Sequence, residues 1–164
     1  MKPVIAIVGR PNVGKSTFFN KVAGRKISIT ENRPGVTRDR ITVDCEWRAR
    51  PFTLIDTGGI ELKSEDTMWK EIAVQAKAAV ELADVILFFT DGREGLTSSD
   101  YDVADYLRRS KKPVVLVVNK VDEYSPDKLF EFYSLGLGEP YAVSSEHSRG
   151  IGDVLDTAVE FFPK

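Results

Sequence analysis

The sequence has few of the features that would mark a secreted or membrane protein, because its 164 residues include one cysteine and no long apolar run. The single cysteine, Cys45, excludes an internal disulfide and is consistent with a reducing cytosol. The chain shows no cleavable signal and no apolar run that could span a membrane, so we expect no membrane partner. The net charge of −2 gives no overall attraction to nucleic acid. An RNA contact would therefore need a local basic patch or a region outside this chain.

Apolar runs alternate with helical patterns along the chain, which predicts a single α/β domain. The strand-like runs are Val4–Val8, Ile41–Trp47, Phe52–Ile55, Val85–Phe89, Val114–Val118 and Tyr141–Val143. The helical patterns are Lys15–Ala23, Glu65–Leu82, Ser98–Ser110, Pro126–Ser134 and Ile151–Phe161. We expect a six-stranded, mostly parallel sheet with helices on both faces. Its one antiparallel strand comes from a hairpin between the second and third runs.

The segment Gly9–Ser16 fits the phosphate-binding pattern G-x-x-x-x-G-K-[ST] and lies between a predicted strand and a predicted helix, which is the context the pattern requires. Successive backbone N–H groups of such a loop wrap phosphates, and the helix N-terminus adds partial positive charge. We expect Lys15 to reach the β- and γ-phosphates and the Ser16 hydroxyl to bind Mg²⁺. The alternative is a tight glycine turn with no ligand. The predicted nucleotide contacts here are Gly9, Arg10, Pro11, Asn12, Val13, Gly14, Lys15, Ser16 and Thr17.

A second motif, D-T-G-G, follows the third strand-like run. A carboxylate at a strand end beside a phosphate loop is the arrangement that holds Mg²⁺, which assigns Asp56 to the metal. Gly59 would offer its N–H to the γ-phosphate, because only glycine allows that close approach. An ordinary turn after a strand is the alternative. The predicted contacts here are Asp56, Thr57, Gly58, Gly59 and Ile60.

The third motif, N-K-V-D, decides which base is bound. The Asp122 carboxylate can accept from both the N1–H and the N2 amine of guanine, whereas adenine lacks both donors and would leave the carboxylate unpaired. We expect Asn119 to brace the loops and the Lys120 stem to lie along the ring. A polar loop in which Asp122 caps a helix is the alternative. The predicted base contacts are Asn119, Lys120, Val121, Asp122, Ser144, Ser145 and Glu146.

Three loop residues carry weaker signals. The backbone N–H of Ser145 could face guanine O6, although a generic loop is a fair alternative. Thr37, in the long irregular stretch 28–40, could bind Mg²⁺ and the γ-phosphate and so make that loop a switch. His147 is the only histidine, and we expect it to be an exposed loop residue without a catalytic role.

These motifs, in this order over about residues 3 to 162, resemble the G domain of translation-type small GTPases. More narrowly they resemble the first G domain of the Der (EngA) family, the bacterial double-Era-like GTPases. The stretches behind this are G-R-P-N-V-G-K-S, P-G-V-T-R-D, D-T-G-G-I and S-E-H-S-R-G-I-G. The family normally has Ala where Ser145 stands, which leaves a backbone role intact.

The resemblance implies a P-loop NTPase G domain over residues 1–164, and a fragment of a longer protein with a second G domain and a KH-like domain. It also implies binding of GTP and GDP with Mg²⁺, association with the large ribosomal subunit and its rRNA, and a cytoplasmic location. We therefore expect a GTP-hydrolysing switch in ribosome assembly.

The position that carries a catalytic glutamine in Ras-like enzymes is Ile60 here, and an isoleucine cannot orient water. Some related GTPases hold K⁺ beside the phosphates through an asparagine of the phosphate loop, which Asn12 matches. We expect slow, K⁺-stimulated hydrolysis with Lys15, Thr37, Gly59 and Asn12 as the catalytic set. Arg10, Arg38 and Arg40 could supply charge, although solvated surface arginines are the default. Two alternatives are a guanine-nucleotide-dependent binding module with negligible hydrolysis and an ATP-dependent phosphate-loop enzyme.

Overall fold

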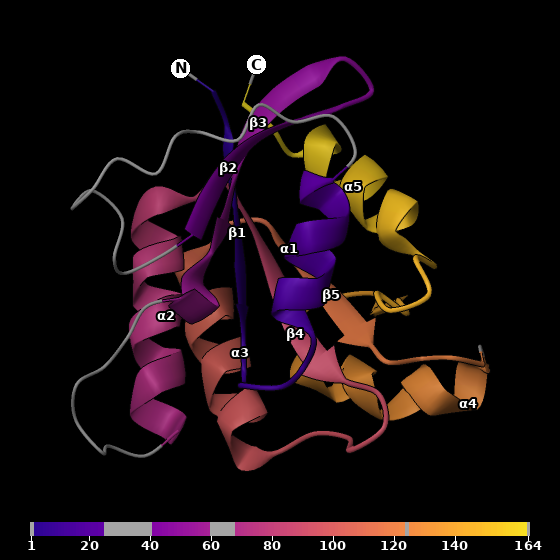
Figure 1. The fold of residues 1–164 in the computed structure, drawn as a ribbon. Coiled ribbons are helices and arrows are strands. Elements are labelled where there is room, and N and C mark those ends of the chain that lie inside the picture. The colour runs from indigo at the N-terminus through magenta and orange to yellow at the C-terminus, as the bar shows by residue number, and fades with distance from the viewer. Residues whose placement is uncertain (1, 25–40, 60–67, 124, 164) are drawn as a thin grey trace.

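A six-stranded sheet lies between two layers of helices in the computed structural model, which describes residues 2–24, 41–59, 68–123 and 125–163 (Figure 1). The strands are β1 (Val4–Gly9), β2 (Ile41–Trp47), β3 (Arg50–Asp56), β4 (Val85–Asp91), β5 (Val114–Asn119) and β6 (Tyr141–Ala142). The helices are α1 (Lys15–Ala23), α2 (Met68–Leu82), α3 (Ser98–Ser110), α4 (Pro126–Leu129) and α5 (Ile151–Glu160), with 3₁₀ turns η1 (Thr57–Gly59) and η2 (Phe130–Leu135).

The sheet has the strand order β2-β3-β1-β4-β5-β6. β2 pairs antiparallel with β3, and every other neighbouring pair is parallel, as the sequence predicted. β1 lies in the middle, where Ala6 is level with Ile55 on one side and Ile86 on the other. Because parallel strands end on the same edge, the loops after β1, β3, β4 and β5 gather at the carboxyl edge of the sheet.

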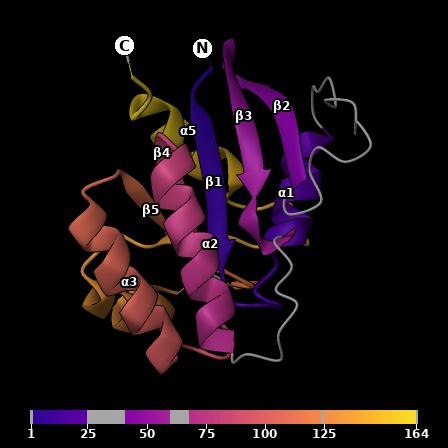
Figure 2. The same cartoon turned by 90° about the vertical axis from the view of Figure 1, so that its left-hand side faces the viewer.

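Each face of the sheet has its own apolar core. α1 and α5 cover one face, where Phe18 packs edge-on against Phe89 with ring centroids 4.9 Å apart. α2 and α3 cover the other, and Figure 2 shows these two helices in front of the strands with α1 and α5 behind. β4 is buried along its whole length because helices lie on both sides of it, which is why its sequence is a continuous apolar run.

The β2–β3 hairpin turns more tightly than the sequence suggested. Its two turn residues, Arg48 and Ala49, both have positive φ angles, of 49° and 64°. Such a turn normally uses Asn or Gly. Here Asp156 of α5 accepts hydrogen bonds from both Trp47 Nε1 and Arg48 Nε, so tertiary contacts with α5 support the strained turn.

One predicted helix is wrong in type. The segment 126–134 was expected to be a single α-helix, but α4 ends at Leu129 and the chain continues as the 3₁₀ turn η2. The buried residues Leu129, Phe132 and Leu135 recur every third position. Three residues per turn place them on one face, whereas an α-helix would rotate them apart.

Candidate functional site

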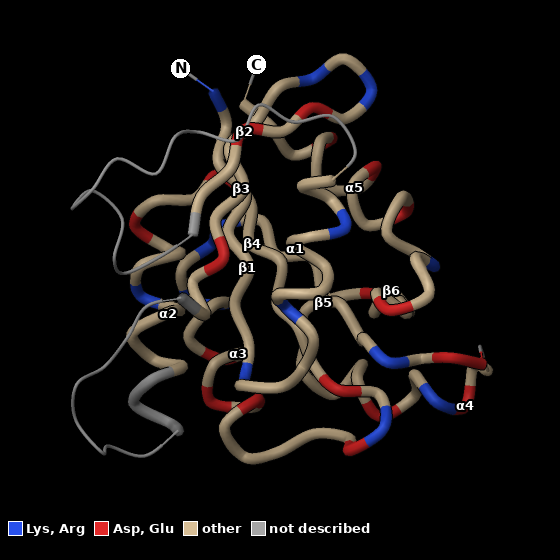
Figure 3. The backbone as a smooth tube through the Cα atoms, in the orientation of Figure 1, with Lys and Arg blue, Asp and Glu red and all other residues tan. Residues whose placement is uncertain are grey.

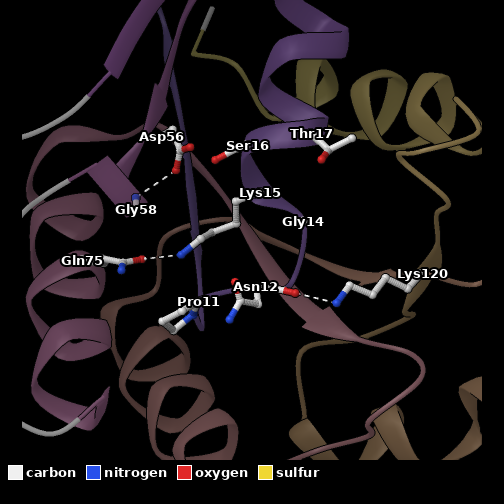
Figure 4. A pocket seen from close by; sticks show the side chains of 10 residues that line it. All are labelled: Pro11, Asn12, Gly14, Lys15, Ser16, Thr17, Asp56, Gly58, Gln75 and Lys120. Carbon is white, nitrogen blue, oxygen red and sulfur yellow. Dashed lines mark hydrogen bonds between the residues drawn. The ribbon is translucent and has the colours of Figure 1, made fainter.

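The phosphate loop closes one side of a cavity of about 550 Å³ at the carboxyl edge of the sheet. Figure 4 shows the residues that line it, which come from the loop after β1, α1, the end of β3, η1, α2 and the loop after β5. They are Pro11, Asn12, Gly14, Lys15, Ser16, Thr17, Asp56, Gly58, Gln75 and Lys120. The structure thus brings the first two sequence motifs together on one cavity.

Gly14 is required at the entrance to α1. Its φ of 90° is a left-handed conformation, and a Cβ there would overlap Asn119 Nδ2. The same Asn119 Nδ2 donates to the Val13 carbonyl at 2.8 Å. The phosphate loop and the N-K-V-D loop are therefore in direct contact at a position that only glycine fits.

Lys15 is buried at the floor of this cavity, and its Nζ donates to the Gly9 carbonyl and to Gln75 Oε1, the latter at 3.1 Å. Gln75 lies on α2, and its side chain is 2% exposed. Gln75 was not among the residues predicted for the site. A signal was available, because a lone polar residue stands on the apolar face formed by Ile72, Ala76 and Ala79.

Asp56 and Ser16 supply the oxygen atoms expected for a divalent cation. Asp56 is 2% exposed, and burial raises the pKa of its carboxyl. The Gly58 N–H, the charge of Lys15 and the Ser16 hydroxyl oppose that rise. Carboxylate and hydroxyl oxygens facing one cavity fit Mg²⁺, which binds hard oxygen ligands and keeps several waters. Thr37, the third predicted ligand, lies outside the described residues.

A smaller cavity of about 80 Å³ adjoins the first and is lined by residues that the sequence predicts to contact the base. Gly14, Thr17 and Lys120 line both cavities. Asn119 braces the site, because its Oδ1 accepts from the Ser145 N–H and hydroxyl, each at 3.0 Å. The Ser145 N–H, expected to face guanine O6, is directed to Asn119 instead.

The Asp122 carboxylate is contacted on both oxygens. Arg93 Nη2 lies 2.6 Å from Oδ2, and the Ser144 hydroxyl donates to Oδ1 at 3.1 Å. The hydrogen bond from the Arg93 guanidinium is the main reason that the pKa of this carboxyl is lowered, and the hydrogen bond from Ser144 is the next. His147 is an exposed loop residue, as predicted, but its Nε2 lies 3.8 Å from Asp122 Oδ1. Nothing in the local sequence pairs Arg93 with Asp122, because they follow different strands.

Lys120 connects the two loops rather than simply covering a base. Its Nζ donates to the Asn12 carbonyl at 2.5 Å and to Asp91 Oδ2 at 2.9 Å. Asp91 ends β4 and is almost fully buried. Burial would raise the pKa of the Asp91 carboxyl, but the Glu94 N–H, Lys120 and the Arg93 N–H outweigh it, so the pKa is lowered. The strand-end argument used for Asp56 applies equally to Asp91 and would have found it.

Arg10 corrects an expectation. The default expectation was a solvated surface arginine, with charge supplied to the phosphates as the other possibility, but Arg10 is 6% exposed and pairs with Asp100 at 3.1 Å. It also donates to Glu94 and to the Gly95 carbonyl. With its guanidinium turned toward the β4–α3 segment, Arg10 holds the phosphate loop in place.

The remaining predicted residues fall into three groups: those with contacts inside the protein, those located at the edge of the site, and those outside the described residues. The Thr57 hydroxyl donates to the Ile7 carbonyl at 2.5 Å. Val121 is buried, and its backbone N–H donates to the Val143 carbonyl. Glu146 is exposed at the small cavity, and Gly59 ends η1. Ile60, Arg38 and Arg40 lie outside the described residues.

None of the helices in the described part of the chain has the length and apolar character needed to cross a membrane. Histidine, cysteine and acidic side chains in ranges 2–24, 41–59, 68–123 and 125–163 form no group of three suited to a metal. Lysines and arginines are interspersed with acidic residues along the backbone (Figure 3), which fits the absence of a global charge bias.

A family model described as "50S ribosome-binding GTPase" matches residues 4–120. The chain is 58% identical over 164 residues to GTPase Der of Clostridium tetani (strain Massachusetts / E88). It is 56% identical over 162 residues to GTPase Der of Clostridium perfringens (strain SM101 / Type A). These matches cover 99% and 98% of the chain, which spans 37% of the length of each of these relatives.

Among solved structures, the fold is similar to that of Era. A variant of Aquifex aeolicus Era bound to GDP·AlF₄⁻ has a TM-score of 0.75 and 30% identity, covering 100% of this chain and 58% of that one. Era in complex with MgGDPNP and a segment of 16S ribosomal RNA has a TM-score of 0.71 and 29% identity, with the same coverage of both chains.

Proposed function

This chain belongs to the 50S ribosome-binding GTPase family and has the P-loop G-domain fold, and from that premise we propose that it binds GTP and GDP and hydrolyses GTP as a molecular switch. The observation that carries the proposal is the pair of adjoining cavities, one at the phosphate loop and one at Asp122, which share three lining residues. A nucleotide has this bipartite chemistry, with anionic phosphates at one end and a hydrogen-bonding base at the other.

Guanine is the base that the small cavity favours. A carboxylate accepts from two neighbouring N–H groups of guanine, whereas adenine offers the Asp122 carboxylate no such pair of donors. Arg93 contacts one oxygen of that carboxylate at an exposed position, so it can move aside when a base with two donors arrives. Asn119 holds the two loops on either side of the base.

In the phosphate cavity each residue has a separate task. A bound Mg²⁺ would supply positive charge that offsets the negative charge on the phosphates. Ser16 and Asp56 would hold it, and Thr37 is proposed as a further ligand. Lys15 binds phosphate oxygens directly, and the Gly59 N–H is proposed to bind the γ-phosphate.

Hydrolysis is proposed to be slow and stimulated by K⁺. The support is Ile60 at the position of a water-orienting glutamine, together with Asn12 at the phosphate cavity. Asn12 has a φ of 68°, a left-handed conformation that Asn tolerates better than most residues. A cation held by Asn12 would stabilise charge between the β- and γ-phosphates. Phosphate release at equal rates in K⁺ and Na⁺ buffers would refute the K⁺ site.

The ribosomal role is proposed from the relatives. The matching family is described as binding the 50S subunit, and one similar Era structure contains ribosomal RNA. We propose a switch in large-subunit assembly, associated with ribosomes in the cytoplasm. We also propose that it forms one G domain of a longer protein, because the relatives extend well beyond the matched region.

Nucleotide competition tests the proposal most directly. Unlabelled GDP should displace a fluorescent guanine nucleotide, and ADP should not. The variant Asp122→Asn should lose guanine affinity by about 100-fold or more and gain affinity for xanthine nucleotides. A variant that kept its guanine preference would contradict the base assignment. Measuring phosphate release in a single turnover separates a hydrolase from a binding module with negligible hydrolysis. Ile60 favours the binding module.

A further inference from the structure

We propose that Gln75 is a specificity-determining residue that discriminates GTP from GDP by competing with the γ-phosphate for Lys15. The inference rests on the proposed nucleotide binding and extends it to a residue of α2 that lines the phosphate cavity and was not among the predicted nucleotide contacts. Its basis is the 3.1 Å hydrogen bond from Lys15 Nζ to Gln75 Oε1 at the floor of the phosphate cavity (Figure 4).

The ammonium group of Lys15 has three N–H bonds. The Gly9 carbonyl and Gln75 Oε1 are two of its acceptors in this structure. GDP offers Lys15 a β-phosphate oxygen, whereas GTP offers it a β- and a γ-phosphate oxygen. Because the number of donors is fixed, GTP displaces one protein acceptor more than GDP does.

Gln75 is the acceptor to be released, because Gly9 is part of the phosphate loop itself. The Gly9 carbonyl ends β1, in the middle of the sheet, and moves with the loop that holds the phosphates. Gln75 instead comes from α2, a separate element on one face of the sheet. The γ-phosphate therefore separates α2 from the phosphate loop at this contact.

The release matters because Gln75 has no equally good donor nearby. Thr57 Oγ1 lies 3.2 Å from Gln75 Oε1, but it has one proton, and the Ile7 carbonyl lies closer at 2.5 Å. Gln75 is 2% exposed, so little of its surface is open to water that could replace Lys15. An acceptor buried without a firm donor is unfavourable, which makes the α2 arrangement seen here less stable once a γ-phosphate is bound.

Two substitutions at Gln75 should move the nucleotide preference in opposite directions. Gln75→Leu removes the competing acceptor, so affinity for a nonhydrolysable GTP analogue should rise about fivefold while GDP affinity stays within about twofold. Gln75→Glu holds Lys15 with a charged acceptor and should weaken the GTP analogue about tenfold relative to GDP. Titration calorimetry of the 164-residue chain with GDP and with the analogue, both with Mg²⁺, measures the ratio.

The controls separate this role from simple packing. Val74→Ala changes the neighbouring, exposed position of α2 and should leave the ratio unchanged. If Gln75→Leu lowers the melting temperature, Gln75→Met, which is closer in shape, replaces it. A Gln75 variant that weakens both nucleotides equally, or changes neither, overturns the inference. A wild-type chain that binds neither nucleotide would instead contradict the proposed function.

Discussion

Arg93 lies across the carboxylate of Asp122, with Nη2 2.6 Å from Oδ2. The two residues follow β4 and β5, neighbouring strands whose carboxyl ends meet at the same edge of the sheet. The carboxylate proposed to recognise the base therefore has a cationic partner from this chain. Guanine has to compete with that partner.

The first prediction concerns this competition. Arg93→Ala should raise GDP affinity about two- to fivefold, because the base no longer displaces an exposed ion pair. The gain should shrink as salt increases, since salt already screens the pair in the wild type. Titration with GDP at low and high salt checks both points. Arg109→Ala, which removes an exposed arginine paired with Asp105 on α3, is the matched control and should change nothing. Weaker GDP binding by Arg93→Ala would mean that Arg93 assists the base.

A second prediction uses two glycines with similar backbones. Gly14 and Gly138 have φ angles of 90° and 85°, but a Cβ at Gly14 would overlap Asn119, whereas nothing lies within 4 Å of one at Gly138. Gly14→Ala should abolish measurable GDP binding because it separates the two loops. Gly138→Ala should cost about 1 kcal/mol of stability from strain alone and keep GDP binding. Thermal unfolding and GDP titration of both variants provide the comparison, and equal loss of binding would show that strain, not the Asn119 contact, is responsible.

The third prediction concerns the buried pair behind the phosphate loop. Asp100 is 1% exposed, accepts from Arg10, and also caps α3 through the Thr97 N–H. Asp100→Ala should lower the free energy of unfolding by about 3 kcal/mol, because it removes the buried carboxylate from a buried guanidinium and leaves it only the Glu94 and Gly95 contacts. Urea unfolding measures this. Asp105→Ala on the exposed side of α3 breaks pairs that contribute little, and its effect should stay below about 1 kcal/mol. Similar losses in the two variants would contradict the structural role given to Arg10.

The fourth prediction concerns Cys45, which is 5% exposed on β2. Burial, with a smaller contribution from Asp44, raises the pKa of its thiol to about 12. The native protein should therefore resist thiol alkylation at pH 8 and react only as it unfolds in urea, because the thiolate is the nucleophile. Since the folded-state pKa is the higher one, this group's contribution to stability is present below the unfolded pKa. It is lost as the pH rises through the folded value. Rapid alkylation without urea would contradict the burial.

The secondary structure was predictable wherever the packing repeats a simple period. β4 reads as a buried strand because helices cover both its faces, and the hydrophobic face of α5 recurs at helical spacing. The segment 126–134 was not predictable, because η2 is set by how Phe132 and Leu135 reach the core rather than by local propensity. The Arg48–Ala49 turn likewise depends on Asp156, more than 100 residues away.

The sequence by itself determined the chemistry that consecutive residues carry out. A phosphate loop uses the backbone amides of adjacent residues, so Gly9–Ser16 could be recognised from order alone, and the N-K-V-D segment could be assigned to a base. The tertiary structure decided which distant side chains meet those segments. Gln75 reaches Lys15 across 60 residues, Arg93 reaches Asp122 across 29, and Asp100 reaches Arg10 across 90. Each pairing arises because parallel strands and the α2 helix converge on one edge of the sheet, a relation that no local pattern encodes.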